Sequence, residues 1–244
     1  MELGISVIGA AGRMGHAVIA AIKERGGRVA AQADAGDDLV AAIAAGDIAI
    51  DFSFHAATCT IIEGAVSLGK ALVIGTTGHS NAERVQLEAL ARKTRTVWAG
   101  NFSMGVNLLF HLVSRASRTL PEGYDVEIVE MHHRFKKDAP SGTAVRLAEV
   151  VREARRLGAD SVVHGRGGIT GERPSGQIGM HALRGGDVVG DHTVMFAALG
   201  ERLELSHKAS DRAIFARGAV HAAHWLVDQP NGLYDMQDVL GLKE

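Results

Sequence analysis

The N-terminal stretch constrains the fold most strongly. Leu3 to Ile8 is a short apolar run typical of a strand, and residues 9–15 read Gly-Ala-Ala-Gly-Arg-Met-Gly ahead of a segment whose apolar residues recur at helical spacing. Residues without bulk let the backbone approach a pyrophosphate, whose charge the N–H groups at the start of a helix can receive. The spacing G-x-x-G-x-x-G differs from the usual G-x-G-x-x-G because Ala11 replaces the second glycine. We therefore predict a phosphate-binding loop, with a simple strand-to-helix turn as the alternative.

A carboxylate follows where a dinucleotide would need one. The run Val29 to Ala33 ends in Asp34, about 20 residues past the glycine loop, the spacing at which an acidic residue meets an adenosine ribose. Such a carboxylate accepts hydrogen bonds from a free 2′-hydroxyl and repels a 2′-phosphate. Residues 35–38 read Ala-Gly-Asp-Asp, so no arginine follows, although Arg13 in the loop can offer a phosphate a positive charge. We predict NADH or NADPH as the cofactor, with a lean towards NADH.

Strand-like and helix-like runs alternate through the first part of the chain. We expect strands at 47–52, 71–74 and 96–98 and helices at 56–68 and 81–93. This alternation predicts an α/β fold with a Rossmann-like, doubly wound parallel sheet, whose ligands bind beyond the carboxyl ends of the strands. Two of the strands end in small polar loops, Gly75 to Gly78 and Gly100 to Ser103, which we place near the cofactor. Each loop taken singly is also compatible with an ordinary turn.

The pattern changes in the second half of the chain. A helix is expected at 105–120, a strand at 125–131 and another helix at 144–157, and strand-like runs follow at 177–183, 193–198 and 202–206. This order predicts a second α+β domain with an antiparallel or mixed sheet. An apolar helix expected at 214–227 can pack back on the first domain, and a short segment at 235–240 follows it. We expect domains at 1–103, completed by 213–244, and at 104–212, with Arg212 at a hinge.

The stretch Glu130 to Thr143, EMHHRFKKDAPSGT, carries the densest group of reactive side chains. Two histidines, an arginine and two lysines precede Ser141, which opens a run with apolar residues at helical spacing. The positive end of that helix would lie beside the cations, so a substrate carboxylate could dock there. The alternative is a solvated basic loop in which Ser141 serves only as the N-cap.

Composition excludes several classes of protein. The chain has 244 residues with a formal net charge of −2, so it lacks the excess positive charge typical of nucleic-acid-binding proteins. It has neither an apolar run long enough to span a membrane nor an N-terminus like that of a signal peptide. We therefore expect a cytoplasmic protein. The single cysteine, Cys59, rules out an intrachain disulfide and is interpreted as a small buried residue of an apolar helix. No metal is expected, since the adjacent His132 and His133 would face opposite ways on a strand, and His221 and His224 are interpreted as half-buried or interface residues.

The order of motifs resembles one enzyme family along nearly the whole chain. The motifs are GAAGRMG, DFS, GTTG, GNFSMGVN, EMHHRFKKDAPSGT, GERPSGQIG, GDVVGDHTVMF, GERLELSHKASDR and GLYDMQDVL. Together they are similar to those of the 4-hydroxy-tetrahydrodipicolinate reductases, also called dihydrodipicolinate reductases. The resemblance implies reduction of a cyclic imine dicarboxylate to tetrahydrodipicolinate by NADH or NADPH, in lysine and diaminopimelate biosynthesis. It also implies a homotetramer joined through the sheet of a substrate-binding and oligomerisation domain.

The resemblance also implies roles for individual residues. His132 becomes the catalytic acid/base and Lys136, rather than the neighbouring Lys137, the proton donor. The substrate contacts are then His133, Ser141, Gly142 and Thr143. The cofactor contacts are Gly9, Ala10, Ala11, Gly12, Arg13, Met14, Asp34, Gly75, Thr76, Thr77, Ala99, Gly100, Asn101 and Phe102. The chemistry of the residues agrees, because hydride arriving at a C=N carbon leaves charge on the nitrogen, and a positioned lysine or histidine can protonate it.

Two other classes of function remain as alternatives. A non-catalytic dinucleotide sensor would use the same glycine loop but would have no need of His132, Lys136 and the Ser-Gly-Thr helix start together. A metal-assisted hydrolase built on the histidines would require a metal and would not depend on reduced nicotinamide. The reductase is the hypothesis that uses all of these features.

Overall fold

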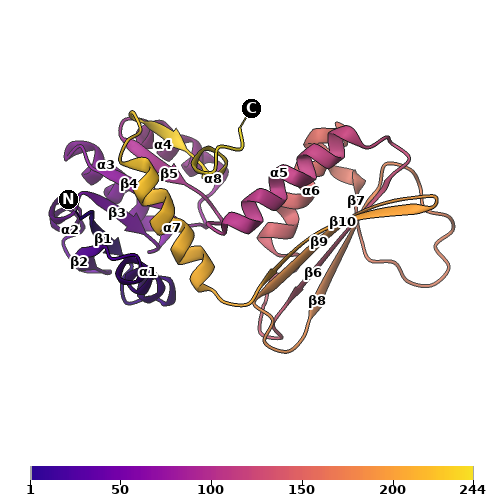
Figure 1. Ribbon diagram of the computed structural model, residues 1–244, viewed down its shortest axis with the longest axis horizontal. Coiled ribbons are helices and arrows are strands. Elements are labelled where there is room, and N and C mark those ends of the chain that lie inside the picture. The colour runs from indigo at the N-terminus through magenta and orange to yellow at the C-terminus, as the bar shows by residue number, and fades with distance from the viewer. Residues whose placement is uncertain (1, 244) are drawn as a thin grey trace. The chain divides into compact units, whose positions relative to one another are not determined.

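The computed structural model describes residues 2–243, which form two compact units (Figure 1). One unit holds the chain up to Met104 together with the chain from Arg212 onward, and the other holds Gly105–Asp211. The chain therefore leaves the first unit once and returns to it once. Each unit has its own sheet and its own apolar core.

The sheet of the first unit is wholly parallel and has the strand order β11-β5-β4-β3-β1-β2. Its strands are β1 (Gly4–Ile8), β2 (Arg28–Ala33), β3 (Ile48–Asp51), β4 (Ala71–Ile74), β5 (Arg95–Trp98) and β11 (Gly232–Tyr234). The prediction of a doubly wound parallel sheet is thus confirmed. The chain order reverses between β1 and β3, so a crevice for a ligand is expected beyond the carboxyl ends of those two strands.

Helices cover both faces of this sheet. One face carries α1 (Arg13–Glu24), α7 (Ala213–Leu226) and α8 (Met236–Val239), and the other carries α2 (Leu39–Ala45), α3 (Thr58–Ser67) and α4 (Asn81–Ala91). Neighbouring residues of a strand serve opposite faces: Ile48 and Ile50 pack with α1 and α7, whereas Ala49 packs with α2 and α3. A strand buried on both faces is mostly apolar, which explains the Ile-Ala-Ile sequence of β3 ahead of Asp51. A single turn, η1 (His55–Ala57), precedes α3.

The second unit has a mixed sheet with the order β10-β9-β6-β8-β7, which confirms the predicted fold class. Its strands are β6 (Asp125–His132), β7 (Val162–His164), β8 (Ile178–Arg184), β9 (Gly190–Ala198) and β10 (Glu201–Ala209). The central strand β6 is parallel to β8 and antiparallel to β9. The helices α5 (Met104–Thr119) and α6 (Gly142–Arg155) cover one face, and the turn η2 (Ala159–Ser161) leads into β7 (Figure 1).

Cys59 is exposed, so the prediction of a buried thiol is wrong. The inner face of α3 is formed by Thr58, Ile61, Ile62 and Ala65, a helical stripe that leaves Cys59 on the outer side.

The helix α6, expected to reach residue 157, ends at Arg155, since Arg156 takes a left-handed conformation with φ 57°. Within residues 2–243, no helix is long and apolar enough to span a membrane.

Candidate functional site

The glycine loop between β1 and α1 is shaped by close approach of its own backbone. A Cβ atom on Gly15 would lie 2.2 Å from the carbonyl oxygen of Gly9 and 2.5 Å from that of Ala10, so only glycine fits there. Gly9 has φ 79°, which favours glycine, and its N–H donates to Ala33 at 2.8 Å. Gly12 is different, because it is exposed and a Cβ on it would meet only the oxygen of Gly9, at 3.2 Å. The loop is therefore closed on its inner side and open at Gly12, as a phosphate-binding loop must be.

Asp34 holds the same loop against the end of β2. Both of its carboxylate oxygens accept hydrogen bonds from the Ala11 N–H, at 2.9 and 3.2 Å. Its own N–H donates to the carboxylate of Asp37 at 2.8 Å. The Asp34 side chain is only half-buried, and Arg13 of the glycine loop is exposed. Its predicted contact with a ribose hydroxyl stays a prediction, now with a second role in fixing the loop.

A buried carboxylate that the sequence reasoning did not single out ties the next two loops together. Asp51, at the end of β3, is fully buried and accepts hydrogen bonds from the Ser53 N–H at 2.9 Å and from the Thr76 hydroxyl at 2.8 Å. Burial raises the pKa of Asp51 above its usual value, against the effect of these donors. The indole N–H of Trp98 donates to the Thr76 carbonyl at 3.3 Å. The ends of β3, β4 and β5 are thus joined by side chains at the edge where the cofactor is predicted.

The remaining predicted cofactor residues divide into exposed and buried ones. Thr77 and Gly100 are exposed, whereas the side chains of Thr76 and Phe102 are buried. Phe102 packs in the core, edge-on to Phe52 with 5.8 Å between ring centroids. Phe102 can therefore meet a ligand only through its backbone. The remaining members of the set are Ala10, Met14, Gly75, Ala99 and Asn101, which lie in the same three loops.

The carboxyl end of β6 carries the buried polar groups of the second unit. Along this strand alternate residues face α5 and α6, and the apolar pair Val126 and Ile128 is followed on that face by Glu130 and His132. The Nδ1 atom of His132 lies 2.6 Å from a carboxylate oxygen of Glu130. Arg184 of β8 donates to both oxygens of that carboxylate, at 2.8 and 2.9 Å. Burial lowers the pKa of His132, against the opposite effect of Glu130.

A second buried imidazole joins this group. His192 of β9 lies opposite Glu130 in the sheet register, and its Nε2 atom is 2.9 Å from the hydroxyl oxygen of Ser141. Ser141 is the N-cap of α6, and its hydroxyl also accepts from the Ala144 N–H at 3.2 Å. Burial lowers the pKa of His192 to about 4, so the ring is neutral near pH 7. The predicted contact of Ser141 with substrate stays a prediction, and its hydroxyl already has two partners.

Lys136, His133 and the start of α6 were predicted to bind the substrate, and they follow Glu130 and His132 closely in sequence. Lys136 forms an ion pair with Asp138 at 2.9 Å and is largely shielded, whereas Lys137 is exposed. His133 is half-buried, and its N–H donates to Val188 at 2.7 Å. Gly142 and Thr143 begin α6, and the first N–H groups of any helix have no acceptor within the helix. The structure thus brings His132 and the α6 start together through Glu130, which accepts from the Ser141 N–H at 3.1 Å.

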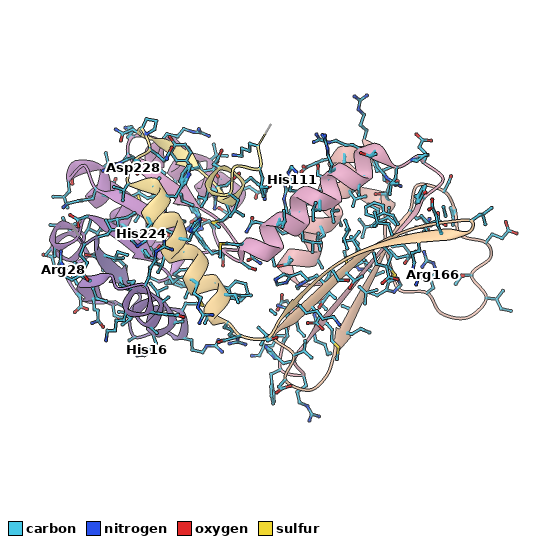
Figure 2. All side chains as sticks on the ribbon, in the orientation of Figure 1. His16, Arg28, His111, Arg166, His224 and Asp228 are labelled. Atoms are coloured by element: carbon cyan, nitrogen blue, oxygen red, sulfur yellow. The ribbon has the colours of Figure 1, made fainter. Side chains whose placement is uncertain are left out.

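Several other histidines lie on helices. His16, His111 and His224 project from three different helices, α1, α5 and α7 (Figure 2). His221 and His224 are half-buried, as interpreted from the sequence. Among residues 2–243, no group of three His, Cys, Asp or Glu side chains is placed to hold a metal ion.

Sequence reasoning named His132 but did not assign roles to the groups around it. Glu130 belongs to the same motif and faces the core two residues before His132, a spacing that a strand pattern makes visible. Arg184 and His192 come from β8 and β9, far along the chain, and the pairing of strands brings them to β6. Only the sheet register identifies these two residues.

Comparisons with known proteins agree on one family. A family model described as "Dihydrodipicolinate reductase, N-terminus" matches residues 3–102, and one described as "Dihydrodipicolinate reductase, C-terminus" matches residues 105–240. The chain is 49% identical to the 4-hydroxy-tetrahydrodipicolinate reductase of Chromobacterium violaceum, in an alignment that covers 100% of both chains. It is 52% identical to that of Akkermansia muciniphila over 244 residues, covering 99% of both.

A solved structure supports the fold independently. The dipicolinate-bound dihydrodipicolinate reductase from Paenisporosarcina sp. TG-14 superposes with a TM-score of 0.76 at 22% identity, covering 98% of this chain and 99% of that one. Both halves of the chain match the family models, and the relatives match it from end to end. The chain therefore belongs to the dihydrodipicolinate reductase family.

Proposed function

We propose that the chain is a 4-hydroxy-tetrahydrodipicolinate reductase, an NAD(P)H-dependent oxidoreductase of lysine and diaminopimelate biosynthesis. Its substrate would be a cyclic imine dicarboxylate and its product tetrahydrodipicolinate. The observation that supports this most directly is the group at the end of β6, where His132 is oriented by a buried carboxylate beside the start of α6. A protein that only sensed a dinucleotide would have no use for that group.

The glycine loop of the first unit fits a dinucleotide. Its inner side accepts no side chain at Gly15, and beside the exposed Gly12 the first N–H groups of α1, at Arg13 and Met14, and the positive end of that helix would face a pyrophosphate. Residues 75–77 and 99–102 would line the remainder of the cofactor site, beyond the carboxyl ends of β4 and β5. When bound, the reduced nicotinamide supplies the hydride.

Substrate recognition would come from the second unit. A dicarboxylate requires countercharge and donors, and the start of α6 at Gly142 and Thr143 offers N–H groups and a positive dipole end. Lys136 and His133 add side-chain donors from the segment that precedes this helix. The two carboxylates of the substrate can thus be held by different groups, which fixes the orientation of the imine ring.

Proton delivery completes the reaction. Hydride addition to a conjugated imine sends electron density to the ring nitrogen, so a C–H and an N–H bond form while a π bond is lost. Lys136 would supply the proton, because its ammonium group is a donor in the same short segment as His132. Its ion pair with Asp138 would hold the ammonium group in place. His132, neutral near pH 7 because burial lowers its pKa, would take up a proton from solvent and return it to Lys136, so that both side chains end the reaction in their starting states.

Paired substitutions test these roles. His132→Ala and Lys136→Ala are expected to lower kcat at least about a hundredfold while the dissociation constant for NADH stays within about twofold. Lys137→Ala is the matched control, because Lys137 is an adjacent lysine with an exposed side chain, and it should turn over at the wild-type rate. If His132→Ala and Lys136→Ala lose cofactor binding together with turnover, the assigned roles are wrong. If all three variants bind NADH and the wild type oxidises none, the sensor becomes the better hypothesis.

Cofactor preference, assembly and location are finer proposals. The carboxylate of Asp34 and the absence of an arginine at 35–38 support a preference for NADH. A homotetramer joined through the sheet of the second unit is supported by family membership, and so is a cytoplasmic location. Rates with NADH and NADPH at equal concentration, and the mass of the purified protein by light scattering, test the first two.

A further inference from the structure

Two carboxylate–imidazole pairs lie on opposite faces of β6, and only one of them reaches the proposed site. Glu127 accepts from Arg166 and Arg173 and lies 2.6 Å from His181, whereas Glu130 accepts from Arg184 and lies 2.6 Å from His132. Glu127 is partly exposed, but Glu130 is 0% exposed. A charge placed so deeply must be fully bonded or it destabilises the fold.

We propose that Glu130, held ionised by Arg184, is a positioning residue that fixes the Nδ1–H tautomer of His132 and strengthens its Nε2 atom as a proton acceptor. The proposal deepens the proposed function, on which it rests, by naming what controls the acid/base. Glu130 itself touches neither substrate nor cofactor in this scheme. It acts through the histidine ring.

The hydrogen bonds of Glu130 support its ionised state. One oxygen accepts from Arg184 at 2.8 Å and from the Ser141 N–H at 3.1 Å, and the other accepts from Arg184 at 2.9 Å and lies 2.6 Å from His132. Burial alone would raise the pKa of Glu130, but the hydrogen bonds from Arg184 and His132 outweigh it and hold the pKa below its usual value. All acceptor positions of the carboxylate that face the protein are therefore occupied by donors.

The ionised carboxylate determines the tautomer of the ring. A carboxylate can only accept, so the neutral imidazole of His132 must carry its proton on Nδ1, and the lone pair is left on Nε2. When Nε2 takes up a proton, the negative charge of Glu130 stabilises the imidazolium that forms. The same device of a carboxylate behind a histidine orients the base in other acid/base sites.

The remaining neighbours of His132 limit both its charge and its movement. The charges of Lys136 and Arg184 oppose protonation, so Glu130 is the negative group that counters them. His192 lies edge-on with 5.2 Å between ring centroids and is neutral near pH 7. A Cβ on Gly190 would lie 2.9 Å from Nε2 of His132 and 3.6 Å from Cε1 of His192, so the backbone of β9 packs against the His132 ring without covering it with a side chain.

The isosteric change Glu130→Gln tests the proposal. The side of the carboxylate that faces two fixed donors, Arg184 and the Ser141 N–H, favours the carbonyl oxygen of the new amide. Its NH₂ group then replaces the oxygen that lies against His132 Nδ1 and one N–H of Arg184, so the hydrogen bond from that N–H is lost. The NH₂ donates to Nδ1, which moves the ring proton to Nε2. We expect kcat to fall about a hundredfold or more with KM within about threefold, and the pH at which His132 titrates to shift down by about one unit or more.

Glu127→Gln is the matched control, since it removes the same kind of carboxylate from the opposite face of the same strand. It should leave the pH–rate profile at the wild-type position. A profile of Glu130→Gln that coincides with that of Glu127→Gln would overturn the proposal. So would a fall in activity that comes entirely from KM.

A spectroscopic measurement on the wild type keeps the proposal testable if Glu130→Gln fails to fold. Protein labelled with ¹⁵N-histidine, compared with His132→Gln to assign the signal, should show His132 with a protonated Nδ1 and an unprotonated Nε2 near pH 7. The opposite tautomer would overturn the proposal. This readout does not depend on turnover, so a wild-type enzyme that failed to reduce the imine would count against the proposed function and not against the tautomer.

Discussion

Replacement of Gly15 by alanine tests whether the glycine loop needs glycine at this position for its own packing, apart from any contact with a ligand. The new Cβ would lie 2.2 Å from the Gly9 oxygen, 2.5 Å from the Ala10 oxygen and 2.6 Å from the Ala10 Cα, all of them backbone atoms. The loop cannot easily retreat, because hydrogen bonds from Gly9 to Ala33 and from Ala11 to Asp34 hold it. Overpacking against fixed backbone costs about 3 kcal/mol. For a chain of this size that corresponds to a melting temperature lower by roughly 6–12 °C.

Gly12→Ala is the matched control in the same loop. Gly12 has φ −73° and ψ 164°, which alanine adopts freely, and its Cβ would meet only the Gly9 oxygen, at 3.2 Å. We expect stability to fall by no more than about 1 kcal/mol. The methyl group would nevertheless occupy the open side of the loop, so the dissociation constant for NADH should rise at least about tenfold, or about 1.4 kcal/mol.

Thermal unfolding and isothermal titration of both variants with NADH are the assays. We expect Gly15→Ala to lose stability and cofactor binding together, and Gly12→Ala to lose binding alone. A Gly15→Ala protein that melts at the wild-type temperature would refute the packing argument. A Gly12→Ala protein that binds NADH as tightly as the wild type would refute the placement of the pyrophosphate.

Three further predictions concern other parts of the chain. Thr76→Val removes a hydrogen bond to the buried Asp51 carboxylate and should lower the free energy of unfolding in urea by about 1–3 kcal/mol. Thr76→Ser keeps a hydroxyl and should retain most of the wild-type stability. A Thr76→Val protein as stable as the wild type would contradict the contribution of this hydrogen bond. The hydrogen bonds from Arg166 (Figure 2), His181 and Arg173 outweigh burial and lower the pKa of Glu127 to about 2 from 4.5, so its stabilisation is present above pH 4.5 and lost as the pH falls towards 2. Solvent screening reduces the contribution of ionised Glu127 to the free energy of unfolding to about 1–2 kcal/mol. The difference in free energy of unfolding between wild type and Glu127→Gln should therefore become smaller from pH 6 to pH 3. A difference that stays constant over this range would contradict the ion pairs. Cys59 should react with a thiol reagent in the native protein, and more slowly than a free thiol, because burial and Glu63 raise its pKa; no reaction without denaturant would contradict its exposure.

The first unit was largely predictable because its signals are local. A strand buried on both faces has a mostly apolar sequence, and the glycine spacing at residues 9–15 determines where the first strand turns into a helix. The helix Leu39–Ala45 was not foreseen, since its apolar residues show no clear helical period and its N-cap, Asp38, had been considered only for its charge. The strand Gly232–Tyr234 is too short to leave a pattern.

The candidate site was predictable only in part. The positions of His132 and Lys136 follow from one motif on a strand and the segment after it. Arg184 and His192 reach Glu130 through the pairing of β6 with β8 and β9, and no local pattern specifies which residues of distant strands meet. The exposure of Cys59 was missed because Ile61 and Ile62 suggested an apolar helix, whereas the face that each residue occupies decides burial.

The reductase activity itself is tested most directly by the absorbance of the reduced nicotinamide. The purified protein is mixed with NADH, and separately with NADPH, while the cyclic imine is generated in the cuvette from pyruvate and aspartate semialdehyde by the preceding synthase. We predict oxidation of the cofactor that requires the imine and is slowed at least about a hundredfold in Lys136→Ala but not in Lys137→Ala. Binding of either cofactor without any oxidation when the imine is present would contradict it.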